Sequence, residues 1–585
     1  MIKLIINSIS NFKKILNKNQ KKRLIGLFVI MIIGGFLEMG SVTLIVPFIQ
    51  TIMSPDEVMS NSLVIAVMDI TGIQIYQTFL VFLSLVMALL FLIKNLFLIF
   101  QLTVQERFIR KSLLSTQNEL LKNIIYKPYE YYLNVQSGEI MCIVMEDTNK
   151  AYSSLSVLLS FFSELIVSSI LLITIFIISP VITVSIGILL LFATLIIYKV
   201  SQNRLRKNAI REMHAMTAMN QTVLQIVQGI KEIKLMRKEE YFREEYDKNG
   251  KIVIRSKYIG QLLSLLPRFM LEAAAMCSFF VILAGLIYKG VEVKILIPAV
   301  SGVAMAAVRL LPSINRISSA LSTLTYYQPA VEKLLETMDS IDDGQQIKDA
   351  TLEKISKQKV DRLRESIVMS GISYSYPCGE TTILNDANMK IVKGQSIGIV
   401  GASGAGKTTA IDIMLGLLKP QAGKIMIDGT DIEQDRNGWF EQIGYIPQTI
   451  FMLDTSIREN VAFGMKVADI DDAMVWDALR EAALDEFVRE LPDGLDTQIG
   501  ERGIRLSGGQ RQRIGIARAL YTKPDVLFLD EATSALDTET ENAIMESIAN
   551  LQGKTTLIII AHRLTTIASC DVIYRVADGK IVRER

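Results

Sequence analysis

The 585-residue sequence contains few of the residues that build metal sites and disulfide frameworks. Its four cysteines lie far apart without a C-x-x-C pair, and it has only two histidines. This pattern argues against a zinc site and against a set of disulfides, and it favours small buried thiols without a chemical role. The formal net charge is only +2, so no overall attraction to nucleic acid is expected.

Long apolar segments are abundant in this chain. Hydrophobic residues make up 50% of the sequence and the mean hydropathy is positive, which is unusual for a wholly soluble protein. The apolar run after Arg23 is much longer than the core of a signal peptide, so we expect no cleavable signal sequence. The segments long enough to cross a bilayer are residues 24–53, 78–102, 155–178, 181–199, 262–288 and 294–322.

Loop charges predict how these six spans are oriented. Residues 54–77 contain acidic side chains but no lysine or arginine, whereas residues 103–154 and 200–260 contain many basic ones. Because basic loops stay in the cytoplasm, both termini are expected on that side. The two inner loops are polar but keep a helical pattern, so spans 2 to 5 are predicted to continue well beyond the membrane.

The sequence divides into four parts by composition. Residues 1–23 place apolar positions at helical spacing among lysines, which predicts a helix lying on the membrane surface or, alternatively, a solvated basic tail. Residues 24–340 hold the six spans, and residues 341–365 lose hydrophobic periodicity, as a linker does. In residues 366–585 apolar strands alternate with helical patterns, which predicts an α/β domain with a largely parallel sheet.

Residues 401–408, Gly-Ala-Ser-Gly-Ala-Gly-Lys-Thr, fit the phosphate-binding pattern G-x-x-x-x-G-K-[ST] between a short apolar run and a helical pattern. Its three glycines allow successive backbone N–H groups and a helix N-terminus to face an anion. Lys407 can reach the β and γ phosphates of a nucleotide, and the Thr408 hydroxyl can hold Mg²⁺. An ordinary glycine-rich turn is the structural alternative.

Further motifs follow in a fixed order. The apolar run 526–530 ends in Asp530, which suits a Mg²⁺ shell, and the adjacent Glu531 can polarise an attacking water. Gln448 follows Gly-Tyr-Ile-Pro, and His562 comes directly after another apolar run. The most specific motif is Leu-Ser-Gly-Gly-Gln at residues 506–510.

With the 401–408 loop, this order of motifs resembles the ATPase domain of ABC transporters. The membrane part precedes the ATPase part in one chain, and residues 126–140 are similar to the coupling segments of exporters. The resemblance implies an α-helical membrane domain of six transmembrane helices with long cytoplasmic extensions, followed by an α/β P-loop ABC ATPase domain. In that family the Leu-Ser-Gly-Gly-Gln segment of one copy caps ATP on the phosphate loop of the other. A homodimer with two composite sites is therefore expected, while pairing with a different half-transporter stays open.

The same resemblance implies a role for each matching residue. Tyr376 stacks on adenine, Gln448 belongs to the Q-loop, Glu531 is the general base and His562 senses the γ-phosphate. The expected catalytic residues are Glu531, His562, Gln448 and Lys407, and the expected Mg²⁺ ligands are Thr408, Gln448 and Asp530. The expected ATP ligands are Tyr376, Gly401, Ser403, Gly404, Ala405, Gly406, Lys407, Thr408 and Thr409, with Ser507, Gly508, Gly509 and Gln510 in trans.

Charged residues inside the predicted spans are costly, at roughly 2.5–3.5 kcal/mol for a central arginine or lysine, so they are informative. Arg268, Arg309 and Arg316 stand in segments that look like those of bacterial flippases for lipid-linked oligosaccharides, where cavity arginines are thought to engage a pyrophosphate. We therefore expect these three arginines to contact an anionic head group. The alternative is pairing with intramembrane carboxylates, such as Arg268 with Glu272 four residues on.

The predicted function is ATP-driven export or flipping of an amphiphile by a homodimer in the bacterial inner membrane, with the ATPase part cytoplasmic. The expected substrate is a polyprenyl-pyrophosphate-linked oligosaccharide, with a multidrug or lipid A-type lipid exporter as the alternative. Membrane lipids are further expected partners, and nucleic acid is not. An alternative of another class is an ATP-gated channel or a regulatory membrane subunit. The six spans exclude a soluble ABC ATPase.

Overall fold

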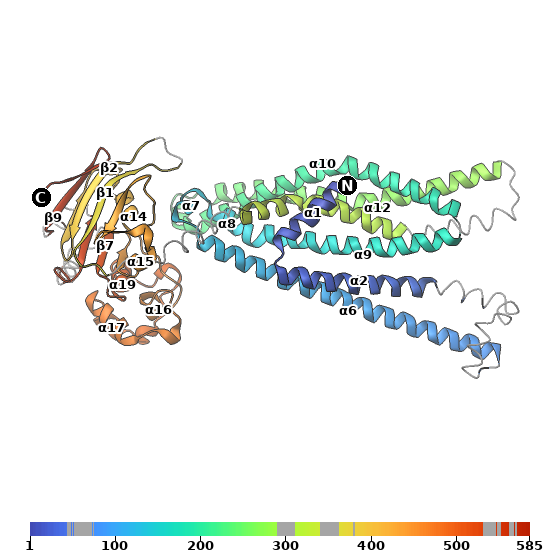
Figure 1. Ribbon diagram of the computed structural model, residues 1–585, viewed down its shortest axis with the longest axis horizontal. Coiled ribbons are helices and arrows are strands. Elements are labelled where there is room, and N and C mark those ends of the chain that lie inside the picture. The colour runs from blue at the N-terminus through green and yellow to red at the C-terminus, as the bar shows by residue number, and fades with distance from the viewer. Residues whose placement is uncertain are drawn as a thin grey trace. The chain divides into compact units, whose positions relative to one another are not determined.

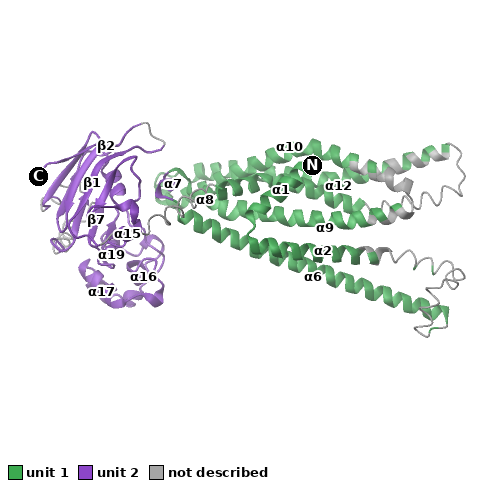
Figure 2. Cartoon of the chain, viewed as in Figure 1, with its two compact units in different colours: residues 1–127, 134–344 green, residues 128–133, 345–585 purple. Residues whose placement is uncertain are grey.

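A computed structural model describes most of the chain in two compact units. The first unit combines residues 1–127 with 134–344, and the second combines residues 128–133 with 345–585 (Figure 2). The first is helical, and the second contains two β-sheets with helices (Figure 1). The described residues are 1–43, 48, 51, 73, 75–178, 180–288, 311–339, 362–377, 381–530, 546, 551–560, 567 and 570–585.

Long helices dominate the first unit. Helix α10 runs beside α12, and α2 packs against both α6 and α9 (Figure 1). Residues 311–339 are also helical. The other helices of this unit are α1 (Ile2–Ile15), α2 (Lys18–Thr43), α6 (Tyr76–Ile125), α8 (Ser137–Met141), the π-helix η1 (Cys142–Asp147), α9 (Thr148–Ile178), α10 (Pro180–Gln228), α11 (Ile230–Leu235) and α12 (Glu239–Tyr288).

These helices agree with the predicted extensions of spans 2 to 5. Helix α6 continues from the second apolar segment to Ile125, and α10 continues from the fourth to Gln228. Helix α12 begins at Glu239, well before the fifth apolar segment. Among the described residues, two helical stretches are long and apolar enough to cross a membrane, Tyr76–Ile125 and Ser137–Ile170. Most of predicted span 6, residues 294–322, lies outside the described residues.

The N-terminal segment 1–23 contains a turn. Helix α1 ends at Ile15, and α2 begins at Lys18 after Asn17 and Gln20 exchange two hydrogen bonds of 2.9 Å each. One face of α1, with Leu4 and Phe12, is buried in the same apolar cluster as residues of α9 and of segment 311–339. The opposite face leaves Ile2, Ile6 and Ile9 exposed among lysines. This exposed face keeps the predicted contact with the membrane surface available to α1.

Two sheets organise the second unit. The four-stranded antiparallel sheet has the order β2-β1-β4-β5, and the six-stranded sheet has the order β10-β9-β3-β8-β7-β6. The strands are β1 (Ser366–Tyr374), β2 (Leu384–Val392), β3 (Ser396–Val400), β4 (Ala422–Ile427), β5 (Thr430–Asp431), β6 (Ile443–Ile446), β7 (Val526–Asp530), β8 (Thr556–Ile560), β9 (Val572–Ala577) and β10 (Lys580–Arg583). The main helices are α14 (Lys407–Met414), α15 (Arg436–Phe440), α16 (Ile457–Val461), α17 (Asp472–Glu481), α18 (Asp485–Glu490) and α19 (Gly508–Leu520).

The six-stranded sheet confirms the predicted parallel arrangement. Strands β9, β3, β8, β7 and β6 pair in parallel, and only β10 is antiparallel to its neighbour. All five residues of β7 and of β8 are buried, as expected for uninterrupted apolar runs in a parallel sheet covered on both faces. The carboxyl ends of β3 and β7 therefore lie along one edge of the sheet, separated by β8 alone.

Candidate nucleotide site

The 401–408 loop joins the carboxyl end of β3 to the N-terminus of α14. Gly404 and Gly406 have φ angles of +80° and +99°, which side-chain-bearing residues rarely adopt. A Cβ added to Gly401 would lie 2.5 Å from the carbonyl oxygen of Val576, so this position also requires glycine. At Gly404 a Cβ would meet nothing within 4 Å, so the space beside this glycine is open. The local geometry therefore fits a phosphate-binding loop.

Lys407 is held inside this loop. Its side chain is buried, and Nζ donates hydrogen bonds to the carbonyl oxygens of Gly401 (2.9 Å) and Ala402 (3.0 Å). These hydrogen bonds fix the ammonium group against the backbone of the loop, close to the N-terminus of α14. A helix N-terminus also favours negative charge. A phosphate bound in this loop would therefore contact the Lys407 ammonium, which is already held in place.

Tyr376, a predicted nucleotide contact, lies near the first turn of α14. Its hydroxyl is 3.1 Å from the hydroxyl of Thr409, and its ring packs edge-on against that of Tyr374, with 5.2 Å between centroids. Tyr374 is buried, whereas Tyr376 is only partly buried. The exposed part of the Tyr376 ring is thus available for stacking on a base next to α14.

Asp530 ends β7 and lies two strands from β3, which places it about 10 Å from the start of the loop. Two residues that the sequence analysis did not single out lie close to it. Burial and, after it, the charge of Asp530 raise the pKa of Asp412, on α14, to about 6. Burial also raises the pKa of Tyr445, on β6, and both Asp530 and Asp412 add to that shift. Asp412 stands four residues after Thr408, hence on the same helix face, and this spacing could have indicated it.

Residues 128–133, which include all but the last residue of the short helix α7 (Tyr129–Asn134), belong to this unit. The Glu130 carboxylate accepts a hydrogen bond from the backbone N–H of Lys419, at 3.3 Å. Burial, followed by the charge of Asp412, raises the pKa of Tyr129 above its usual value. A segment from the predicted coupling region thus lies close to the helix that follows the phosphate loop.

The Leu-Ser-Gly-Gly-Gln motif forms the start of α19. Ser507 and Gln510 make a capping box: the Gln510 N–H donates to the Ser507 hydroxyl (3.2 Å), and the Ser507 N–H donates to the Gln510 side chain (2.8 Å). Leu506 is buried beneath, while Ser507 and Gly508 are exposed. Helix α19 packs on α16, α17 and β6, and no hydrogen bond within the described part of the chain joins residues 507–510 to residues 401–408.

Gln448, Glu531 and His562 are three further residues predicted for the nucleotide site. Gln448 is exposed just after β6, which neighbours β7. Glu531 and His562 lie outside the described residues. Their sequence neighbours Asp530 and Ile560 end the adjacent parallel strands β7 and β8.

The predicted substrate arginines have different surroundings. Arg316 pairs with Glu164 of α9, with 2.5 Å between Nε and Oε1, so its charge is already opposed. The guanidinium of Arg268 lies 6.0 Å from the ring centre of Phe269, and no ion pair between Arg268 and Glu272 is found in the described structure. Arg309 lies outside the described residues. Glu164 was not among the predicted site residues, although it is one of few carboxylates in an apolar span.

Two family models match the chain. The model for the ABC transporter transmembrane region matches residues 24–297, and the model named ABC transporter matches residues 384–534. The chain therefore belongs to the ABC transporters, and its membrane region and ATPase domain are fused as in exporters, whose ATP hydrolysis is coupled to transport.

Individual relatives extend over most of the chain. The heterocyst differentiation ATP-binding protein HepA of Nostoc sp. is 29% identical over 455 residues, 78% of this chain and 73% of its own length. The putative multidrug export ATP-binding/permease protein YgaD of Bacillus subtilis is 27% identical over 499 residues, 81% of this chain and 80% of its own length. Three plant ABC transporter B family members are much longer, and the chain covers 21% or 22% of each.

A solved structure shares the fold over nearly the whole chain. It is described as a bacterial Atm1-family ABC exporter with ATP bound, and it aligns with a TM-score of 0.75 at 21% identity. The alignment covers 97% of this chain and 95% of that chain. This likeness concerns the fold.

Proposed function

We propose that two copies of this chain form a homodimer in the bacterial inner membrane, with the ATPase parts in the cytoplasm and two ATP sites at their interface. The single observation that carries the proposal is the exposed, capped N-terminus of α19, which has no described hydrogen bond to the phosphate loop of its own chain. A helix N-terminus favours anions, so this end suits the γ-phosphate held by the partner copy.

Exposed apolar side chains in the helical extensions of the first unit support a second copy as their cover. On α12, Ile254 is 70% and Tyr258 is 64% exposed, and on α6 Ile125 is 63% exposed. These positions lie outside the predicted spans, so lipid does not cover them. Contact with a second copy would remove these apolar side chains from water.

The residues of the nucleotide site can perform hydrolysis as follows. Backbone N–H groups of the 401–408 loop and Lys407 bind the β and γ phosphates, and Tyr376 stacks on adenine. Glu531 accepts a proton from water as the water oxygen bonds to the γ-phosphorus and the bond to the β–γ bridging oxygen breaks. Ser507 to Gln510 of the partner copy close over the γ-phosphate, and His562 holds it.

Thr408, Gln448 and Asp530 are the residues that would hold Mg²⁺. Their hydroxyl, amide and carboxylate oxygens are the hard donors that this ion prefers. Asp530 is 8% exposed, and its charge adds to burial in raising the pKa of Asp412. A cation bound there would reduce the repulsion between these two carboxylates. Mg²⁺ supplies charge neutralisation of the transferred phosphoryl group.

We propose a polyprenyl-pyrophosphate-linked oligosaccharide as the substrate, with Arg268, Arg309 and Arg316 binding the pyrophosphate. The Glu164–Arg316 pair suits this role, because an anionic head group can replace Glu164 as the partner of Arg316. The same pair also neutralises one of the three charges, and together with the name of the YgaD relative it favours a second candidate, export of uncharged or cationic drugs.

ATP-dependent translocation in proteoliposomes distinguishes these substrates. A polyprenyl-pyrophosphate glycan, a lipid A-type lipid and a hydrophobic cationic dye are compared under the same conditions. The proposal expects movement of the glycan lipid alone. Transport of the dye without the glycan lipid would support the drug exporter, and ATP-gated ion flux without transport of any of the three would support a channel or a regulatory subunit.

A further inference from the structure

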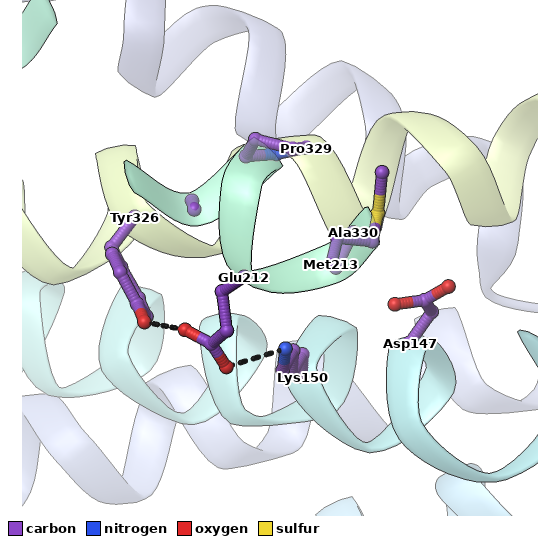
Figure 3. Close-up of a pocket in the computed structure, with 8 residues that line it drawn as sticks. Asp147, Lys150, Glu212, Met213, Tyr326, Pro329 and Ala330 are labelled. Atoms are coloured by element: carbon purple, nitrogen blue, oxygen red, sulfur yellow. Dashed lines mark hydrogen bonds and ion pairs between the residues drawn. The ribbon is translucent and has the colours of Figure 1, made fainter. Parts of the chain in front are cut away.

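A largely buried polar cluster joins four helical elements of the first unit in the predicted cytoplasmic extensions. It consists of Asp147 at the end of η1, Lys150 on α9, Glu212 on α10 and Tyr326 in segment 311–339, and we call it the Glu212 cluster. Lys150 Nζ donates to Glu212 Oε1 at 2.9 Å, and the Tyr326 hydroxyl donates to Glu212 Oε2. Figure 3 shows the Glu212 carboxylate between these two donors, with Asp147 on the other side of Lys150.

The cluster contains more negative than positive charge. Glu212 is 1% and Asp147 is 4% exposed, so both carboxylates are almost completely removed from water. They line one small pocket with a single ammonium, that of Lys150, between them. In the described structure Asp147 has no hydrogen bond or ion pair of its own. An ionised Asp147 therefore competes with Glu212 for Lys150.

The other charged groups near Asp147 do not offset the excess negative charge of the cluster. They are Lys333 in segment 311–339, Glu146 on η1 and Glu139 on α8. Lys333 is already paired with Glu139, at 2.7 Å. The remaining polar group on the pocket is the Tyr326 phenol, and the apolar wall consists of Ala209, Met213, Pro329 and Ala330.

Helix α12 packs closely against the Tyr326 side of the cluster. Helix α12 approaches the Tyr326 ring at Gly260, where an added Cβ would lie 2.5 Å from the nearest ring carbon. The phenol therefore has little room to move away from Glu212 while α12 stays in place. Any separation of α10 from segment 311–339 in this region must break the Tyr326–Glu212 hydrogen bond.

We propose that the Glu212 cluster is a proton-sensitive latch, which holds α9, α10 and segment 311–339 together while Asp147 is protonated and opens more readily when Asp147 is ionised. Segment 311–339 is the last described helix before the ATPase part in the sequence. Opening the latch thus frees one of the segments through which the chain passes from the first unit to the second. The proposal rests on the chain being an ABC exporter and is independent of the substrate.

The expected size of the effect follows from proton linkage. Burial is the largest cause that raises the pKa of Asp147, to about 6 from 3.8. If opening returns Asp147 to water, the closed latch binds the proton more tightly than the open one. Lowering the pH from 7 to 5 should then favour the closed latch by about tenfold.

Hydrogen–deuterium exchange on the full-length protein in nanodiscs tests this proposal. Peptides around Tyr326 and Glu212 are followed at pH 5 and pH 7, with correction for the intrinsic pH dependence of amide exchange. The wild type should exchange about tenfold more slowly at pH 5. In Asp147→Asn the latch should stay closed, with equally slow exchange at both pH values.

Two further variants keep the test decisive. Arg206→Gln removes the exposed Arg206–Glu332 ion pair between α10 and segment 311–339 (2.9 Å), and it should retain the wild-type pH dependence. Tyr326→Phe removes one bond of the latch and should speed exchange at both pH values. Wild-type pH dependence in Asp147→Asn, its loss in Arg206→Gln, or unchanged exchange in Tyr326→Phe would each overturn the proposal.

Discussion

Replacing Asp147 with Asn should raise the free energy of unfolding of the first unit at neutral pH. This gain in stability should become smaller as the pH falls. Burial raises the pKa of Asp147 to about 6, whereas the ordinary value is 3.8. The folded state therefore binds this proton more tightly than the unfolded chain, and the stability it contributes is lost as the pH rises from about 4 to 6. A shift of about two pKa units corresponds to about 3 kcal/mol at pH 7.5.

Denaturant-induced unfolding of the two proteins in detergent measures this difference. The reactivity of Cys142, a buried thiol on η1, reports on unfolding of the membrane unit when it is read by mass spectrometry. Asparagine has the shape of aspartate without its charge, so the variant should gain about 3 kcal/mol at pH 7.5, about half of that at pH 5, and little at pH 4. Equal stability of the two proteins at pH 7.5, or a gain that does not change with pH, would refute the assignment of a buried, ionising Asp147.

The remaining predictions concern nucleotide and substrate. Glu531→Gln should bind ATP normally and accumulate a closed dimer, because the base that accepts the proton from water is lost; ATP hydrolysis at the parental rate would contradict this role. Lys407→Ala should weaken ATP binding by about 10- to 100-fold in a titration, since at least one charge-assisted hydrogen bond worth about 1.5–3 kcal/mol is lost, and an unchanged Kd would count against the loop. Arg309→Ala should abolish glycan-lipid translocation while basal ATPase activity persists, and unaffected translocation would exclude this arginine from the substrate site.

The nucleotide-binding half was predictable because its motifs are local. The 401–408 loop and the capped helix at Ser507 each depend on backbone conformations that a few consecutive residues determine, namely left-handed glycines and a Ser-x-x-Gln capping box. Uninterrupted apolar runs likewise predicted the parallel strands β7 and β8. Tyr445 was missed because its proximity to Asp530 depends on the order of strands in the sheet, whereas the spacing of Asp412 from Thr408 is a local signal that went unused.

The membrane half was predictable in outline only. Helical patterning in polar loops correctly indicated that α6, α10 and α12 extend past their apolar segments. The partners of these charged side chains could not be predicted, because Glu164 meets Arg316, and Lys150 meets Glu212, across helices that are far apart in the sequence. Arg268 and Glu272 show the limit of sequence spacing, since four residues on one helix make a pair possible without bringing the two charges together.

The composite ATP site is the central claim, and mixing two inactive variants tests it most directly. Lys407→Ala removes the cation of the phosphate loop, while Gly508→Asp places a negative charge at the exposed end of α19. A Cβ at Gly508 meets nothing within 4 Å, so this second change leaves the fold of its own chain intact.

Each variant alone should lack ATPase activity, because every site in its homodimer is defective. When the two chains are co-expressed in equal amounts with different affinity tags, dimers purified through both tags should contain one site with both changes and one intact site. About half of the wild-type ATPase activity per dimer is predicted if the two sites act independently. Doubly tagged dimers without activity above either variant alone would contradict a site shared between two chains.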